Sequence, residues 1–479
     1  MILRVINHPY EFDMKNLCIT FFPHEKIRLE EEEDPVVVTT RRETDGSFFV
    51  SAKVYDVYRE TTAKPKPADE EHLVLSVTLY RLLSGILGFA PPWGVLYGVR
   101  PAKLMHRLCA QMGDDAAVAH FQTAFSTQKS KAELAHEVML HENRSIARSG
   151  PKSFSLYVSI PFCPTRCAYC SFVSHSIEKT HKLMTPYVDL LLRELEETAK
   201  YAKELGLELA TVYFGGGTPT TLSAQDLGRI FSTIEQNFDL SHLMEYTVEA
   251  GRPDTVTRER LEVIQAAGVQ RISINPQSFN DKVLEAIGRR HTAQQTLDAF
   301  ALARDCGFDH INMDFIAGLP EDDLPSFQRS IQTALDLQAE SITVHTLALK
   351  TSAYMVTREQ TFDLKDRLTV SNMVDYAGQT LHGAGYYPYY MYRQSKSLGN
   401  LENVGWCKPG YDCLYNVYMM DETHTVLAVG AGAVTKLRGQ NSGMIERIYN
   451  YKYPYEYIRD FDTLLERKKR IPGFYAEYD

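Results

Sequence analysis

The stretch SLYVSIPFCPTRCAYCSF (155–172) contains a β-strand pattern followed directly by a loop rich in cysteine. The loop places Cys163, Cys167 and Cys170 in a C-x3-C-x2-C spacing, in a chain that holds eight cysteines. A structural zinc site would need four ligands, and His175 could supply the fourth. A [4Fe–4S] cluster is usually held by four thiolates, so three would leave one iron open to a substrate or cofactor. The spacing therefore predicts a metal centre, either zinc or an iron–sulfur cluster with an open iron.

Strand-like and helix-like segments alternate after residue 153. Six β-favouring segments predict buried strands at 155–160, 209–214, 245–250, 271–276, 310–316 and 341–349. Helices are expected between them near 187–206, 223–238, 257–267, 293–306 and 323–338, with Ser223 as an N-cap. This alternation is typical of a parallel sheet, and it predicts an α/β fold with an incomplete (β/α)6 barrel over residues 151–360. Ligands of such barrels bind at the C-terminal ends of the strands.

Two further regions flank the predicted barrel. Residues 1–150 predict an N-terminal α+β accessory region, with strands at 17–22, 35–40 and 47–58 and then helices up to residue 147. Residues 361–479 predict a smaller C-terminal α+β domain, with a helix at 366–385 and two strands within 417–436 around a turn at 421–423. The run YYPYYMYR (386–393) fits either an aromatic wall for a ligand or an edge strand containing a proline.

The composition is that of an ordinary globular protein, with 44% hydrophobic and 23% charged residues. The formal net charge of −10 argues against nucleic acid or an anionic membrane as the main partner. The apolar segment 73–90 approaches the length of a membrane span, but Arg81 lies in its middle, so it predicts a buried helix. The first ten residues lack the pattern of a secretion signal. We therefore expect a cytoplasmic protein whose clustered cysteines hold metal.

A second motif, YFGGGTPT (213–220), follows the second predicted barrel strand. Its three glycines let the backbone approach a ligand closely. This motif and the cysteine loop, with Tyr169 before its third cysteine, together resemble the radical S-adenosylmethionine (SAM) superfamily. The resemblance implies a [4Fe–4S] cluster whose open iron binds SAM. In that superfamily, reduction of the cluster cleaves SAM to methionine and a 5′-deoxyadenosyl radical, which abstracts hydrogen from the substrate.

More of the chain is similar to one branch of the superfamily, the oxygen-independent coproporphyrinogen III dehydrogenases. The similar segments are YVSIPFCPTRCAYCSF, GGGTPT, VEAGRPD, INPQSFND and MDFIAGLP. Within this branch, LYGVRPAKL (96–104), NLENVGWCKPG (400–410) and AVGAGAVTK (428–436) resemble the HemZ type. The resemblance implies an oxidoreductase of anaerobic haem biosynthesis that converts two propionates of coproporphyrinogen III to vinyl groups, giving protoporphyrinogen IX. It also implies a flavodoxin or ferredoxin as electron donor.

The resemblance assigns roles to matching positions. It implies that Cys163, Cys167 and Cys170 bind the cluster, and that the cluster-bound SAM or its surroundings contact Tyr157, Gly216, Thr218 and Glu249. Some relatives bind a second SAM, and the positions similar to its contacts are Tyr169, Gly217, Gln277, Arg289, Asp314 and Ala348. Val434 matches a further cofactor contact. Asp314 also stands out in its apolar run, because a buried carboxylate is costly unless it has a partner.

The implied substrate carries four carboxylates, so a local basic pocket is expected in this acidic chain. Bidentate arginine suits carboxylates. The candidates at or near the predicted strand ends or the tyrosine-rich segment are Arg252, Arg271, Arg289, Arg290, Lys350 and Arg393. His345 could act as a haem ligand or proton donor, although a lone buried histidine is more often a hydrogen-bonded core residue.

Two positions depart from the pattern of coproporphyrinogen enzymes. Phe172 occupies the place of their fourth cysteine, and Ser159 the place of a histidine. Phenylalanine at the first position is shared with haem chaperones of the same family. A haem-binding chaperone is therefore an alternative function, and a radical SAM methyltransferase that opens the haem ring is another.

Overall fold

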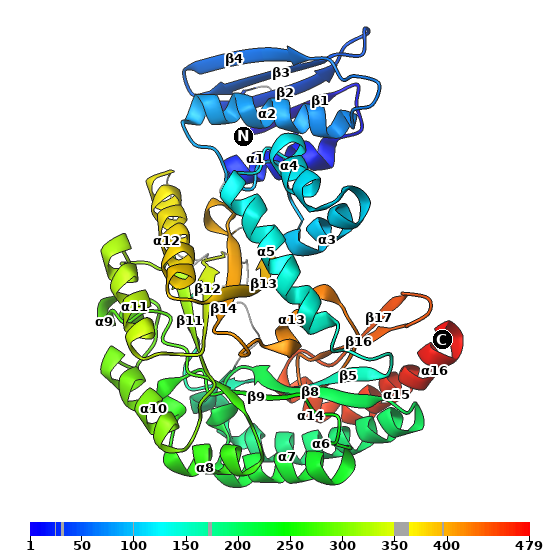
Figure 1. Cartoon of the computed structure of the whole chain (residues 1–479), viewed down its shortest axis with the longest axis vertical. Coiled ribbons are helices and arrows are strands. Elements are labelled where there is room, and N and C mark those ends of the chain that lie inside the picture. Colours follow the sequence, from blue (N-terminus) through cyan, green and yellow to red (C-terminus); the bar gives the residue numbers. More distant parts are fainter. Residues whose placement is uncertain (24, 30–32, 99, 171–174, 349–363, 395–396) are drawn as a thin grey trace.

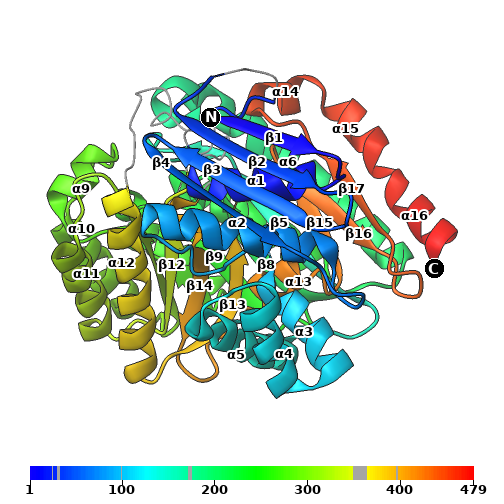
Figure 2. The same cartoon turned by 90° about the horizontal axis from the view of Figure 1, so that it is seen from above.

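The computed structural model describes residues 1–23, 25–29, 33–98, 100–170, 175–348, 364–394 and 397–479. Figure 1 shows a small lobe with the N-terminal sheet above a larger lobe with the barrel, and a long helix running between them. Seen from above, the N-terminal sheet overlies the barrel (Figure 2). Within the described residues, no helix combines the length and apolar character needed to span a bilayer.

The N-terminal lobe is built on a four-stranded sheet in the order β1-β2-β3-β4. Its strands are β1 (Ile2–Ile6), β2 (Val36–Arg42), β3 (Phe48–Val54) and β4 (Val57–Ala63). The strand predicted at 17–22 is wrong, because this segment belongs to helix α1 (Glu11–Phe21). Met14, Leu17, Cys18 and Phe21 are its buried residues, and their helical spacing places one apolar face in the core.

Four more helices follow this sheet, as predicted: α2 (Glu71–Leu87), α3 (Pro101–Met112), α4 (Asp114–Ala124) and α5 (Lys129–Ile146). The apolar segment 73–90 forms most of α2, whose Arg81 is exposed. Helix α5 joins the two lobes, since Lys131 donates to Glu402 (Nζ–Oε1 2.6 Å) in the large sheet. The Trp93 indole donates to the other oxygen of the same carboxylate, at 2.7 Å.

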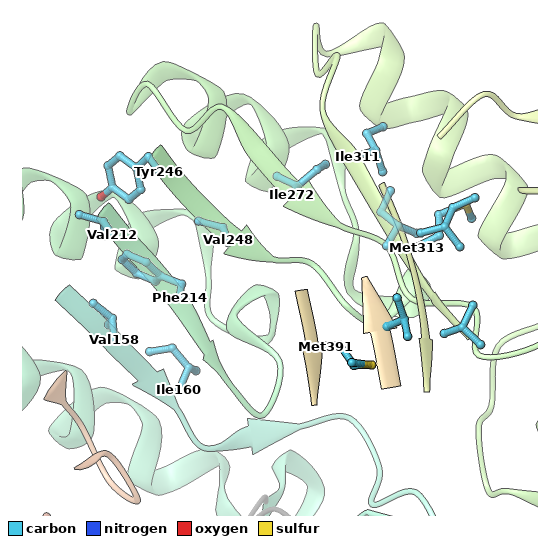
Figure 3. Close-up of a cluster of buried hydrophobic side chains, with 14 of the residues drawn as sticks. Val158, Ile160, Val212, Phe214, Tyr246, Val248, Ile272, Ile311, Met313 and Met391 are labelled. Carbon is cyan, nitrogen blue, oxygen red and sulfur yellow. The ribbon is translucent and has the colours of Figure 1, made fainter. Parts of the chain in front are cut away.

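The six predicted barrel strands are present and pair in parallel in the order β5-β8-β9-β10-β11-β12. They are β5 (Ser153–Ile160), β8 (Glu208–Gly216), β9 (Glu245–Glu249), β10 (Arg271–Ser273), β11 (Ile311–Ala317) and β12 (Ser341–Thr346). Val158, Val212, Val248 and Met313 alternate with inward-facing residues and belong to one apolar cluster with the surrounding helices (Figure 3). The α/β fold with an incomplete barrel is therefore confirmed.

Helices cover the outside of these strands (Figure 1). They are α6 (Ile177–Glu204), α7 (Ala224–Asn237), α8 (Arg258–Ala266), α9 (Asp281–Ala286), α10 (Ala293–Asp305) and α11 (Leu324–Asp336). Ser223 caps α7 as predicted, because its hydroxyl accepts the backbone N–H of Asp226. Two short strands, β6 (Phe162–Cys163) and β7 (His175–Ser176), pair beside the end of β5.

The C-terminal segment contributes strands to both edges of the barrel sheet. Its elements are α12 (Leu364–Gly383), β13 (Tyr387–Arg393), β14 (Glu402–Cys407), α13 (Leu414–Asp421), β15 (Thr425–Val429), β16 (Val434–Arg438), β17 (Ile445–Tyr449), α14 (Pro454–Arg459), α15 (Phe461–Lys468) and α16 (Arg470–Tyr478). Strand β14 pairs antiparallel with β12, and β15 pairs parallel with β5. The division of the chain at residues 150 and 360 stays a prediction.

One prediction for this segment is wrong. Residues 417–421 belong to helix α13, and the two strands are β15 and β16, joined by a turn at 430–433. Helix α13 buries Leu414, Tyr415, Val417 and Tyr418, so it has no polar face that would reveal its helical period. Strand β13 is the edge strand that the alternative interpretation of 386–393 predicted.

Candidate active site at the carboxyl ends of the barrel strands

The cysteine loop lies where β5 ends. Cys163 closes the short strand β6, and the backbone N–H of Cys170 donates to the carbonyl of Cys167 at 3.1 Å. The Thr218 hydroxyl donates to the Cys163 sulfur, with an Oγ1–Sγ distance of 3.4 Å. The loop is tied to the next part of the barrel because the N–H of Ala168 donates to the carbonyl of Ile287 at 2.9 Å. The structure therefore brings the three cysteines and the end of the glycine motif together.

Arg252 braces this loop. Its guanidinium donates to the carbonyl and the hydroxyl of Thr165, at 3.3 and 3.2 Å, and lies 3.8 Å from the Cys167 sulfur. The other edge of the guanidinium pairs with both carboxylate oxygens of Asp254, at 3.0 and 3.1 Å. Thr165 and Asp254 are partners that the sequence motifs did not reveal.

Arg289 makes a second brace on the same loop. It donates to the carbonyl of Asn275 at 2.5 Å and to the hydroxyl of Tyr169 at 3.2 Å. Both Arg289 and Tyr169 therefore lie beside the cysteines. Exposed Arg290, the alternative candidate, instead pairs with Glu178 at 2.6 Å.

The glycine motif packs against the strand that leads into the cysteine loop. The N–H groups of Gly217 and Thr218 donate to the carbonyls of Ile160 and Phe162, each at 2.7 Å. A Cβ at Gly217 would lie 2.6 Å from the Phe162 carbonyl oxygen, and Gly216 has a φ of +102°. Only glycine therefore allows this contact between the two motifs.

Glu249 ends strand β9 on the inner side of the barrel. It accepts a hydrogen bond from the Tyr213 hydroxyl, with an Oη–Oε1 distance of 2.6 Å. Burial raises the pKa of Glu249 to about 7, and the negative charge of Asp314 adds to this effect, while the Tyr213 hydrogen bond opposes it. The Tyr213 ring stacks on Tyr157 and on Tyr415 from α13, with centroids 6.3 and 4.4 Å apart. Glu249 is therefore poised between its charged and neutral forms near neutral pH.

Asp314 forms a second acidic position across the barrel. It accepts from the Asn312 side chain at 2.7 Å and lies 3.9 Å from Nε2 of His345. Burial disfavours its charge, but His345 and Asn312 outweigh burial and hold the pKa of Asp314 below its ordinary value. The other ring nitrogen of His345 lies 3.2 Å from the Tyr392 hydroxyl. These residues form a continuous polar chain from β11 to β13.

The remaining predicted positions lie around this edge. The backbone N–H of Gln277 donates to the carbonyl of Asp314 at 2.9 Å, and Gln277 adopts a φ of +66°. Ala348 forms a bridge with Ser397 beyond β12. Val434 begins β16, just after the turn that follows β15. The Ser159 hydroxyl donates to the carbonyl of Ala431 at 2.8 Å.

Comparisons with known proteins identify the family. The Radical SAM superfamily matches residues 157–334. The oxygen-independent coproporphyrinogen-III oxidase-like protein HemZ of Bacillus subtilis (strain 168) is 34% identical over 452 residues, which cover 92% of this chain and 90% of HemZ. The chain belongs to the radical SAM family of HemZ. Its predicted resemblance is thereby confirmed.

Two more relatives bear on the family and the fold. The heme chaperone HemW of Haemophilus influenzae is 30% identical over 320 residues, covering 66% of this chain and 78% of HemW. The structure of coproporphyrinogen III oxidase HemN from Escherichia coli aligns with a TM-score of 0.50 and 21% identity, over 68% of this chain and 72% of HemN. The HemN likeness supports the fold alone.

The cofactors of a HemZ-family protein are a [4Fe–4S] cluster and SAM, and the described residues fit both. The three cysteines lie on one loop, with Arg252 and Arg289 beside it. The glycines of the second motif have no side chains, so their backbone can lie directly against this loop. Of the two metal centres that the cysteine spacing allows, the family therefore identifies the iron–sulfur cluster and not zinc. His175, its suggested fourth ligand, lies on β7 with its ring 5.8 Å from that of Tyr453.

The predicted basic pocket is only partly supported. Arg252 and Arg289 are engaged by the cysteine loop, and Arg393 donates to the carbonyl of Leu96, so it holds the N-terminal lobe against β13. Arg271 is fully buried at the opposite, N-terminal end of strand β10. Lys350 and Phe172 lie outside the described residues. Within the described part of the chain, these candidates do not form one pocket.

A cavity of about 280 Å3 opens where β11 ends. Its lining includes Gly318, Leu319 and Asp322 after β11, together with Val370 and Met373 of α12. This volume lies near the lower limit of small-molecule sites, roughly 300–1,000 Å3. The MDFIAGLP motif therefore borders a hollow at the same edge as the cysteine loop.

Proposed function

We propose that this HemZ-family protein catalyses the oxidative decarboxylation of two coproporphyrinogen III propionates to vinyl groups, giving protoporphyrinogen IX in the cytoplasm. Similarity to HemZ over most of both chains supports this function. Each conversion removes one hydrogen atom, one carbon dioxide and one electron from a propionate. The cluster and SAM supply the hydrogen-abstracting radical, and a flavodoxin or ferredoxin supplies the electron that starts it.

The proposed roles of the residues follow their positions. Cys163, Cys167 and Cys170 bind the cluster. Tyr157, Gly216, Thr218 and Glu249 would contact the cluster-bound SAM or its surroundings, where an ionised Glu249 would attract the SAM amino group. A second SAM would lie against Tyr169, Gly217, Gln277, Arg289, Asp314 and Ala348, and Val434 would make a further cofactor contact. The braces from Arg252 and Arg289 keep the cysteine loop in place while these molecules exchange.

The observation that carries the proposal is the polar chain of Asp314, His345 and Tyr392, which lies next to tyrosine rings inside the barrel. Tyr390 and Tyr392 stack with centroids 6.2 Å apart, in one cluster with Tyr213 and Tyr415. A porphyrinogen offers pyrrole N–H donors and propionate acceptors around broad apolar faces. Aromatic walls with a few fixed polar groups suit such a ligand.

A haem chaperone is the second candidate, favoured by the similarity to HemW. A haem iron usually takes a histidine nitrogen as axial ligand. Both ring nitrogens of His345 already have neighbours, namely Asp314 and Tyr392. This arrangement favours a hydrogen-bonding role for His345, and with it the porphyrinogen substrate.

An anaerobic assay separates the candidates. It contains protein with reconstituted cluster, SAM, reduced flavodoxin, an electron acceptor and coproporphyrinogen III, and mass spectrometry follows 5′-deoxyadenosine and the tetrapyrroles. We expect protoporphyrinogen IX to form together with deoxyadenosine. Deoxyadenosine without any tetrapyrrole change would reject the substrate. Haem would then be added, and tight binding without consumption would indicate a chaperone, whereas methylated linear products would indicate the ring-opening methyltransferase.

The variant His345→Gln tests the carrying observation. We expect protoporphyrinogen formation to fall at least about 10-fold, comparable to the loss of one oriented polar contact, while deoxyadenosine formation persists. His242→Gln changes an exposed histidine and serves as the matched control. Unchanged decarboxylation in His345→Gln would show that the polar chain does not act on the substrate.

A further inference from the structure

We propose that the N-terminal helices hold a second metal site, for a divalent transition ion of the zinc type, formed by Cys109, Asp114 and His136. The ligand atoms of these three side chains all lie within 4.8 Å of one another. At this separation, small side-chain movements would bring all three ligand atoms into contact with a single ion. This site lies in the small lobe and shares no residue with the cluster loop.

The fold creates this convergence from three helices. Cys109 lies in the last turn of α3, and Asp114 is the first residue of α4. The single residue between these helices is Gly113, with a φ of +84°, and its N–H donates to the carbonyl of Cys109 at 2.9 Å. A left-handed residue here turns the chain abruptly, so the thiol and the carboxylate come to one side. Helix α5 packs against both helices and supplies His136.

His136 already points at the other candidate ligands. Its Nε2 atom is buried from solvent and lies 3.1 Å from the Asp114 Oδ2 atom. A metal ion between the nitrogen, the carboxylate and the thiol would satisfy all three groups at once.

The donor set identifies the class of ion. One sulfur, one nitrogen and one oxygen suit zinc, which binds sulfur at about 2.3 Å and nitrogen or oxygen at about 2.0–2.2 Å. Calcium and magnesium prefer oxygen ligands alone. Asp114 is 55% exposed and His136 is 23% exposed, so a water molecule can reach the fourth position from outside. We therefore expect three protein ligands and one water.

The position of the ion suggests what it does for the protein. It would tie α3, α4 and α5 to one another. Helix α5 also carries Lys131, which pairs with Glu402 of the large sheet. Bound metal would therefore stiffen the helices through which the small lobe contacts the barrel, in a chain whose catalytic proposal does not depend on this ion.

The test uses the full-length protein with its cluster reconstituted. After passage through a metal-chelating resin, Co2+ is added anaerobically, and difference spectra record the visible ligand-field bands of tetrahedral cobalt. Zn2+ is then added to displace the cobalt, and bound zinc is counted by mass spectrometry of the desalted protein. We expect one ion per chain in addition to the cluster iron, with a sulfur-to-cobalt charge-transfer band.

Four variants decide the assignment. In Cys109→Ser, Asp114→Asn and His136→Gln we expect zinc affinity to fall by at least about 10-fold, the lower end of losses seen when even an outer-shell partner is removed. Cys306→Ser, at another partly exposed cysteine, should bind as the unchanged protein does. Equal binding in all four variants, or no ion in the unchanged protein, would reject the site.

Folding and the proposed function are monitored separately. Asp114 is exposed, so Asp114→Asn removes a ligand without leaving a cavity. The cluster iron and deoxyadenosine formation report whether each variant is folded. Loss of zinc with retained iron supports the second site whether or not coproporphyrinogen III is the substrate.

Discussion

The two ends of strand β9 carry the same kind of side chain in opposite roles. Glu245 begins the strand and Glu249 ends it. They are four residues apart, and alternate residues of a strand face the same side, so both point to the inside of the barrel. The end with Glu245 is closed by helix α13, and we call it the closed end. The end with Glu249, where the cysteine loop and the glycine motif meet, is called the open end.

Glu245 is a structural acid. It is 5% exposed and accepts the backbone N–H groups of Leu414 and Tyr415, at 2.5 and 3.2 Å. The Cys413 thiol also donates to it, at 3.4 Å. These groups form the first turn of α13, where helix N–H groups lack partners within the helix. Glu245 therefore fixes the helix that fills the lower part of the barrel.

Glu249 has far fewer partners. The Tyr213 hydroxyl is its donor among the described residues, and its pKa is raised to about 7 by burial. Glu245 has several hydrogen-bond donors and stabilises the fold. Glu249 has fewer donors and is therefore available to a ligand. The identity of the side chain is the same at both ends, so partners distinguish the roles.

The largest effect should come from the cysteine loop at the open end. Replacing any one of Cys163, Cys167 and Cys170 by Ala should abolish the cluster and all deoxyadenosine formation, because three thiolates are the minimum that the family's cluster uses. Iron content and electron paramagnetic resonance after reduction measure this. Cys306→Ala is the control. Normal iron in a loop variant would overturn its assignment as a ligand.

The closed end should respond through stability. Glu245→Ala leaves two buried N–H groups without their acceptor and removes a negative charge near buried Arg271. It should lower the free energy of unfolding by about 3–5 kcal/mol. Glu249→Ala removes one hydrogen bond together with a desolvated acid, and should change it by less than about 1 kcal/mol. Urea unfolding followed by circular dichroism compares the two. Equal losses would erase the contrast between the ends.

A pH titration of SAM affinity separates the same two acids by function. With a pKa of about 7 in the ligand-free protein, Glu249 is mostly protonated below pH 7 and ionised above it. The ionised form attracts the SAM amino group, so affinity should rise by about 10-fold from pH 6 to pH 8. Glu249→Gln should bind SAM more weakly and lose this rise. A rise that persists in Glu249→Gln would place the titrating group elsewhere.

The same contrast explains what the sequence could and could not predict. The six barrel strands, the helix after Ser223 and the pairing of the cysteine loop with the glycine motif depend on short-range patterns, and each appears in the structure. Helix α1 was predicted as a strand because LCITFF is rich in β-favouring residues, whereas its buried face follows from the longer segment 11–21.

Contacts between segments far apart in the chain could not be predicted from the sequence. Strand β15 pairs with β5, about 270 residues earlier. Tyr415 stacks on Tyr157 from helix α13, of which residues 417–421 are predicted as a strand. Arg252 and Arg289 were predicted to bind substrate because bidentate arginine suits carboxylates, yet the structure uses them on the cysteine loop. Residue type was informative there, and the partner was set by the tertiary fold.

The smallest change at the open end removes only the hydrogen bond to Glu249. Tyr213→Phe keeps the aromatic ring between Tyr157 and Tyr415 but takes away the hydroxyl that lowers the pKa of Glu249. The pKa should therefore move above 7, and the midpoint of the SAM titration should shift to higher pH by about one unit. Tyr415→Phe changes the neighbouring ring, whose hydroxyl makes no hydrogen bond to Glu249 among the described residues, and should leave the midpoint in place. A downward shift of the midpoint in Tyr213→Phe would contradict this prediction. It would show that the Tyr213 hydroxyl stabilises the neutral form of Glu249 and not the ionised form.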